Sequence, residues 1–134
     1  MKPETLETRL LKRIARKNGD VFLRADFTDL GGYDQVGRAL CNLVRKRQLL
    51  KVGQGIYTRA ATSPFSGDAV PPKGLRTLRE ALVRLGIKTA PTRLEQDYEA
   101  GRTTQVPTGR VVAVSRRVRR KIGYGGTLLR FERA

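Results

Sequence analysis

The residues best suited to chemistry lie on the polar face of a predicted helix in the first third of the chain. Arg38 and Asn42 recur at helical spacing, and Gln35 lies beside them near the amino end of the same stretch. Arginine can donate two hydrogen bonds to guanine, and asparagine or glutamine can bind adenine in the same paired way. These residue types on one face therefore predict contacts with base edges in a DNA major groove. The alternative is that Gln35 and Arg38 only cap and solvate the helix.

Two further residues of this helix complete the predicted DNA-binding face. Arg45 continues the polar face toward the carboxyl end of the helix, and Tyr33 opens it. For Tyr33 two roles stay open, because its ring can pack in the core while its hydroxyl reaches a phosphate.

A second polar group surrounds a predicted tight hairpin. Residues 49–59 contain two short apolar stretches joined through Gly53 and Gly55, and glycine reaches the positive φ values that such a turn needs. The polar side chains that flank this turn are Lys51, Gln54 and Arg59. We expect them to contact phosphates or the minor groove of a bound duplex, because the two glycines let the backbone approach closely.

A third group, of cations, lies near the end of the chain. Segment 103–134 holds eight Lys or Arg residues and one acid, a net charge of 8 − 1 = +7. In a strand over 116–122, alternation would direct Val118, Arg120 and Ile122 inward. The outward cations would be Arg117, Arg119 and Lys121. This stripe predicts a second polyanion surface, and the alternative is a solvated strand whose charges protect a sheet edge.

A helix must hold the first group of polar side chains. Residues 33–47 place Val36, Leu40 and Leu43 on one apolar stripe, as a half-buried helix does. Three elements are expected before it: a helix over residues 2–17 that Asn18-Gly19 ends, an extended stretch over 20–23, and a short helix over 24–30. Gly31-Gly32 would form the turn between the second and third helices. This order, followed by the hairpin, predicts a winged helix-turn-helix.

Composition favours a polyanionic partner. The 134 residues include 28 Lys or Arg and 12 Asp or Glu, a formal net charge of +16. Nucleic acid is the commonest partner of such a protein, and an anionic membrane surface is the minor alternative. No apolar run approaches the ~20 residues of a membrane span, and no signal peptide pattern opens the chain, so we expect a cytoplasmic protein with no membrane partner.

The residue types that commonly carry out catalysis are scarce. The chain has no His, and its single cysteine, Cys41, is expected to be a small packing residue at the flank of the helix stripe. No cluster of metal-ligating residues, phosphate-cradling loop or nucleophile motif occurs. We therefore predict no enzyme activity, no catalytic residue, no metal and no cofactor.

The amino-terminal half resembles the winged-helix domain of AbiEi-type antitoxins. The runs that carry this resemblance are GDVFLR at 19–24, DF at 26–27, DLG at 29–31, YDQVGRAL at 33–40 and LKVGQGIY at 50–57. A second patch, TTQVPTG at 103–109, is similar to a motif that small bacterial relatives of these proteins carry after a linker. The resemblance implies a repressor that binds its own promoter. It also implies that the carboxyl-terminal region counters a nucleotidyltransferase-like toxin, in a type IV toxin-antitoxin module of phage defence (abortive infection).

Together these patterns predict an α+β protein in two parts. Residues 1–62 would form the winged helix-turn-helix, 63–74 a proline-bearing linker, and 75–134 a small basic α/β region with helices against an antiparallel sheet. The predicted function is that of a DNA-binding autoregulator and antitoxin. The alternative is an RNA- or ribosome-associated basic protein. Whether the toxin is contacted directly, and whether the protein is a monomer or a homodimer, stays open.

Overall fold

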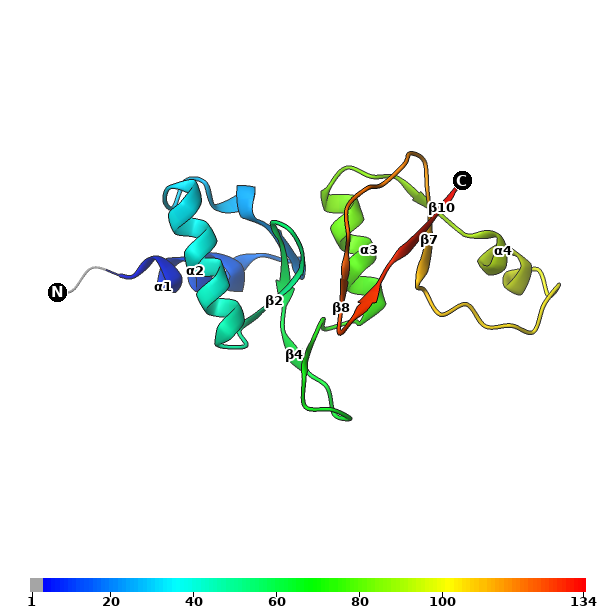
Figure 1. The fold of residues 1–134 in the computed structure, drawn as a ribbon, viewed down its shortest axis with the longest axis horizontal. Helices are drawn as coiled ribbons and strands as arrows, with labels where there is room; N and C mark the ends of the chain where they lie inside the picture. Colours follow the sequence, from blue (N-terminus) through cyan, green and yellow to red (C-terminus); the bar gives the residue numbers. More distant parts are fainter. Residues whose placement is uncertain (1–3) are drawn as a thin grey trace.

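The computed structural model describes residues 4–134 and shows helices and several small β-sheets in an α+β fold (Figure 1). The first half contains three helical segments and one sheet. Its elements are α1 (Leu6–Arg16), β1 (Val21–Leu23), the 3-10 helix η1 (Arg24–Phe27), α2 (Tyr33–Arg45), β2 (Leu49–Gly53) and β3 (Ile56–Arg59). The order predicted from the sequence is confirmed, although Lys2 of the expected first helix lies outside the described residues.

The first helix begins at Leu6 and ends at Arg16, within the range that the sequence predicted. The Thr5 hydroxyl accepts a hydrogen bond from the Thr8 backbone N–H at 3.2 Å, which caps the amino end. The helix ends at Arg16 and Lys17 is extended, so the chain leaves the helix before the Asn18-Gly19 pair that was expected to end it. The Arg59 guanidinium instead donates hydrogen bonds to the carbonyl oxygens of Ile14 and Lys17, both at 2.8 Å. A side chain distant in sequence thus satisfies the open carbonyls at this helix end.

The hairpin and the extended stretch form one antiparallel sheet, in the order β1-β3-β2. Gln54 and Gly55 form the turn, and Gly55 has a φ of +72°, as the sequence predicted for a tight connection. One hydrophobic cluster joins this sheet to the helices. Phe22, Phe27 and Leu40 are among its fully buried side chains.

The second half contains two helices, a mixed sheet and two short hairpins. Its elements are β4 (Ala61–Thr62), β5 (Ala69–Val70), α3 (Leu75–Arg84), β6 (Thr89–Ala90), α4 (Arg93–Glu99), β7 (Val111–Val114), β8 (Gly123–Tyr124), β9 (Thr127–Leu128) and β10 (Arg130–Arg133). The β4–β5 hairpin overlaps the stretch predicted as a linker. Pro91 precedes the Thr92 cap of α4 and lies outside its first turn.

The predicted antiparallel sheet was wrong in one pairing. The sheet order is β10-β7-β6, and β10 runs parallel to β7 while β6 runs antiparallel to it. A parallel pair needs a long crossover, which residues 115–129 provide here. Apolar alternation indicates which residues face inward but not the direction in which a strand runs, so the sequence pattern left this choice open.

Residues 116–122 do not form the predicted strand. The chain bends at Ser115 and Arg116 and then runs to Ile122 without strand pairing. Ile122 is fully buried and Val118 is half-buried, as expected, but Arg120 is exposed rather than inward. Two apolar anchors four residues apart fit an irregular segment as well as a strand, which explains the error.

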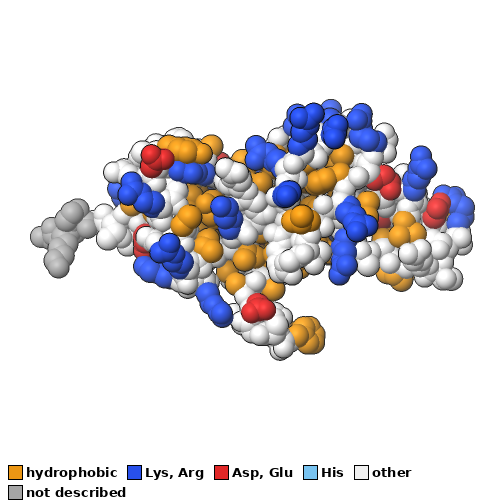
Figure 2. Space-filling model, in the orientation of Figure 1, with side chains coloured by type: hydrophobic (Ala, Val, Ile, Leu, Met, Phe, Trp, Pro, Cys, Tyr) orange, Lys and Arg blue, Asp and Glu red, His pale blue; other side chains and the backbone are white. Residues whose placement is uncertain are grey.

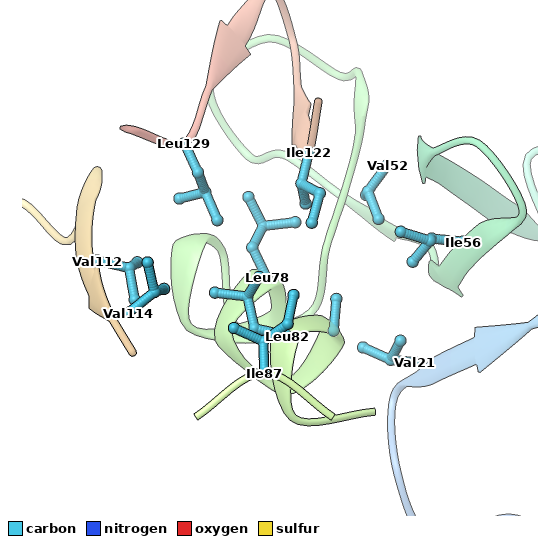
Figure 3. Close-up of a cluster of buried hydrophobic side chains, with 11 residues drawn as sticks. Val21, Val52, Ile56, Leu78, Leu82, Ile87, Val112, Val114, Ile122 and Leu129 are labelled. Carbon is cyan, nitrogen blue, oxygen red and sulfur yellow. The ribbon is translucent and has the colours of Figure 1, made fainter. Parts of the chain in front are cut away.

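The two predicted parts share a hydrophobic cluster around α3. Figure 3 shows Val21 and Ile56 of the first sheet on one side of Leu82, and Val112 of β7 on the other. The Asp20 backbone N–H also donates to the Glu80 carboxylate at 3.0 Å. This shared cluster weighs against independent folding of the first half.

Within residues 4–134, no helix has the length and apolar character needed to cross a bilayer.

Candidate nucleic-acid interface

A groove between α2 and the hairpin turn collects three of the predicted site residues. Arg38 of α2, Lys51 of β2 and Gln54 of the turn line a depression of about 500 Å³. Arg38 and Lys51 are exposed, and neither takes part in an ion pair with another residue of 4–134. Their charges are therefore available to an anionic ligand.

Arg24 also lines this groove, and sequence reasoning missed it. Its guanidinium carbon lies 3.4 Å from the centroid of the Tyr33 ring, and its Nε donates to the Tyr33 carbonyl oxygen at 3.1 Å. A guanidinium nitrogen also lies 3.8 Å from the Asp34 carboxylate. A Cβ at Gly37 would overlap this guanidinium. A glycine inside a helical pattern was the available signal, since it often marks such a close approach.

A second groove of about 720 Å³ lies on the other side of the hairpin turn. Arg24, Gln54 and Gly55 line both grooves, so the two adjoin at the turn. The far wall is made by Arg119, Arg120 and Lys121. The backbone of this segment lies close to β2, because a Cβ built on Gly53 would be 3.0 Å from the Lys121 carbonyl oxygen.

The two grooves together form one cationic surface, which we call the turn surface. In Figure 1 the hairpin at β2 faces the second half of the molecule, and the orange segment before β8 descends from the upper edge on the side that faces this hairpin. Figure 2 shows Lys and Arg side chains gathered along that edge over the carboxyl-terminal half. Asp34 is the one acidic residue among the described residues that line the grooves. The arrangement therefore presents a nearly uniform positive field to a ligand.

The predicted stripe of Arg117, Arg119 and Lys121 is divided by the structure. All three side chains are exposed. Arg117, however, lines a separate depression beside Phe131 of β10, while Arg120 joins Arg119 and Lys121 at the turn surface. The irregular path of 116–122 replaces the strict alternation that the prediction used.

Of three other predicted residues, two are occupied within the protein and one lies against a neighbouring helix. The Gln35 side chain accepts a hydrogen bond from the Gly32 N–H at 3.2 Å and so caps α2. Asn42 is half-buried beside the Glu7 carboxylate of α1, where it contributes, after Lys46, to lowering the pKa of Glu7. Arg59, contrary to the prediction, caps α1 and pairs with Asp20 at 3.3 Å, so it serves the fold rather than the groove.

Arg45 and Tyr33 keep an exposed position. Arg45 lies seven residues after Arg38, on the same face of α2, beyond the lining of the grooves. Tyr33 is 67% exposed and lines the second groove, so its ring does not pack in the core.

The floor of the first groove contains an unexpected pair. Cys41 is exposed there rather than packed as predicted, and Tyr57 lies beneath it. Burial raises the pKa of the Tyr57 phenol, with a smaller contribution in the same direction from its contact with Cys41. Tyr57 therefore offers a neutral hydroxyl and no charge at neutral pH.

The acidic residues lie elsewhere and hold the helices together. Lys46 pairs with Glu7 at 2.7 Å and lowers the pKa of that carboxyl. Arg13 pairs with Asp29 at 2.6 Å and lowers the pKa of Asp29 in the same way. These pairs join α1 to α2 and to the loop after η1, and Asp34 is the one acid among the described residues that line the turn surface.

Comparison with models of protein families shows to which family the chain belongs. A model described as a family of unknown function, DUF6088, matches residues 9–134. The chain belongs to the DUF6088 family. Neither curated proteins nor solved structures gave a match.

The side chains of this DUF6088 protein offer binding chemistry at the turn surface. Residues 4–134 contain no group of three or more His, Cys, Asp or Glu side chains placed to hold a metal ion. Guanidinium and ammonium groups in the grooves can bind phosphates, and Arg38 and Gln54 can also donate hydrogen bonds to base edges.

Proposed function

We propose that this DUF6088 protein binds double-stranded DNA through a winged helix-turn-helix in its first half. In this assignment α2 is the recognition helix and the β2–β3 hairpin is the wing. The observation that carries the proposal is the convergence of Arg38, Lys51 and Gln54 on one groove, where neither Arg38 nor Lys51 forms an ion pair with another described residue.

In the proposed complex, residues of α2 contact the bases and residues of the hairpin contact the phosphates. Arg38 projects from the middle of α2, where a helix in a major groove reaches base edges. Lys51 lies on the hairpin, where a contact with the backbone would fix the register of the helix. Arg24 and Gly37 hold the start of α2 against the turn and so keep the two contacts in a fixed relation.

The biological role proposed is that of a repressor of its own promoter and antitoxin of a type IV toxin-antitoxin module. The resemblance of residues 19–57 to AbiEi-type antitoxins supports this role. The carboxyl-terminal region would counter a nucleotidyltransferase-like toxin, and the protein itself would not act as an enzyme.

A second candidate is an RNA- or ribosome-associated binding protein. The specific observation in its favour is the second groove, where Arg119, Arg120 and Lys121 extend the cationic surface beyond the predicted duplex contacts. A surface that binds phosphates without reading bases needs only such charge.

Fluorescence anisotropy with labelled promoter DNA tests the proposal. Replacing Arg38 by Ala should remove roughly 1–3 kcal/mol of discrimination at one base pair. The matched control is Arg9→Ala, which removes one exposed arginine from α1 and should leave discrimination unchanged. Equal weakening on promoter and random duplex would make Arg38 a phosphate contact and contradict the base-reading assignment.

Competition separates the two candidates. Unlabelled random duplex and RNA should displace labelled promoter DNA much less well than unlabelled promoter. Displacement by RNA as effective as that by promoter DNA would favour the second candidate. Growth rescue of cells that express a neighbouring nucleotidyltransferase-like toxin tests the antitoxin role, and absence of rescue would reject it.

A further inference from the structure

We infer that the second groove binds a single-stranded stretch of nucleic acid, with one base stacked on Tyr33 and the adjoining phosphates on Arg119, Arg120 and Lys121. This site goes beyond the proposed duplex contacts. It uses the side of the hairpin turn that faces the carboxyl-terminal segment, whereas Arg38 and Lys51 lie on the other side.

The lining of this groove has the composition that a nucleotide needs. Its four cations are Arg24, Arg119, Arg120 and Lys121, and no Asp or Glu of the described chain lines it. Apolar side chains, Leu23, Ile56 and Leu85, complete the lining. The volume of about 720 Å³ lies in the range of small-ligand sites. A ligand with negative phosphates and a flat, largely apolar base matches both parts.

Tyr33 supplies the stacking surface. One face of its ring is covered by the Arg24 guanidinium at 3.4 Å, and the residue is nevertheless 67% exposed. Arg24 is itself fixed by the Tyr33 carbonyl oxygen and the Asp34 carboxylate. The ring is therefore held in place at the mouth of a cationic groove, as aromatic platforms for single strands are.

The exposed ring distinguishes a single strand from a duplex. Bases in a duplex are stacked on each other and offer only their edges to a protein, so a duplex would use the cations and leave the ring of Tyr33 without a partner. Unpaired bases of RNA or DNA can stack on the ring whatever their sequence. The ring therefore favours a flexible single strand.

Anisotropy with labelled oligothymidylate, oligouridylate and a random duplex tests the inference on the full chain. Tyr33→Leu should weaken both single strands roughly tenfold, the effect expected for loss of one base–aromatic stack. Tyr33→Phe should retain single-strand affinity. Both variants remove the hydroxyl that could contact a duplex phosphate and differ only in the ring, so they should bind the random duplex equally well. The two oligonucleotides also show whether the groove prefers RNA or DNA.

Salt dependence tests the cations separately. Replacing Arg119, Arg120 and Lys121 together by Gln should lower the salt slope for oligothymidylate by about 2, because each phosphate contact on a single strand contributes about 0.7. The control replaces Arg9, Arg16 and Arg93, three exposed arginines outside the grooves, by Gln and should leave the slope nearly unchanged.

Two results would overturn the inference. Unchanged single-strand affinity in a Tyr33→Leu protein with unaltered thermal stability would remove the stacking platform. Equal losses on duplex and single strand would make Tyr33 a contact to phosphate alone. Neither result bears on Arg38, whose effect is measured on promoter duplex, so the failure of this site and that of the proposed function are distinguishable.

Discussion

The close approach of Arg24 to Gly37 makes a quantitative prediction through a double-mutant cycle. Glycine in a helix interior costs about 1 kcal/mol relative to alanine. In the native background a Cβ at position 37 would displace the Arg24 guanidinium, whose three atoms are its nearest neighbours. That displacement would remove a cation–π contact of about 0.5–1 kcal/mol and a charged hydrogen bond of about 1.5 kcal/mol. Gly37→Ala should therefore destabilise the native protein by about 1 kcal/mol.

The same substitution should have the opposite sign once Arg24 is shortened. In an Arg24→Ala background the space is open, so Gly37→Ala should stabilise the fold by about 1 kcal/mol. The coupling between the two sites is then about 2 kcal/mol, measured by urea unfolding of the four proteins. Equal effects of Gly37→Ala in both backgrounds, within about 0.5 kcal/mol, would refute the contact between Arg24 and α2.

Three further predictions concern the core, an ion pair and the hairpin. Leu82→Ala should lower the free energy of unfolding by about 2–5 kcal/mol and lower the midpoint of one shared unfolding transition, because Leu82 is buried between the two halves. Two separate transitions in calorimetry would contradict the shared core. The pairing with Arg13 lowers the pKa of Asp29 in the fold, so the pair stabilises the protein above pH 3.8, and this stabilisation is lost as the pH falls through the lowered pKa. Asp29→Asn should therefore make the melting temperature fall less steeply with pH in this range. A dependence of the melting temperature on acid pH that is unchanged in the variant would argue against the pair. Lys51→Ala should weaken binding about equally on all duplexes and reduce the salt slope by about 1, whereas an unaltered slope would exclude Lys51 from the contact surface.

The sequence predicted the local elements of the first half because their signals are local. The apolar spacing of Val36, Leu40 and Leu43 fixed the buried face of α2, and all three side chains are buried in the structure. Glycine chemistry placed the hairpin turn at Gln54 and Gly55. Because the helix face and the turn followed from short-range patterns, the sequence also placed Arg38 and Lys51 on the same surface.

The expectations from the sequence differ from the structure at residues whose side chains could contact more than one neighbouring element. Asn42 and Arg38 share the polar side of α2, but Asn42 is half-buried beside the Glu7 carboxylate of α1, whereas Arg38 is exposed. Arg59 follows a strand that the sequence predicted well, yet the carbonyls at the end of α1 take its guanidinium. Periodicity indicates whether a side chain points toward the core or the surface, but it does not indicate which other element packs against that side chain.

The sequence by itself determined the charge, the amphipathic helices and the hairpin of this DUF6088 protein, since each depends on residue types and spacings within a few turns of chain. Only the tertiary structure shows that Arg120 lies beside the hairpin turn, that the Arg24 guanidinium contacts Gly37, and that β10 runs parallel to β7. These contacts join residues far apart in sequence, and they depend on how buried apolar side chains of both halves pack around α3. Packing of that kind is a property of the whole set of side chains, so no local pattern contains it.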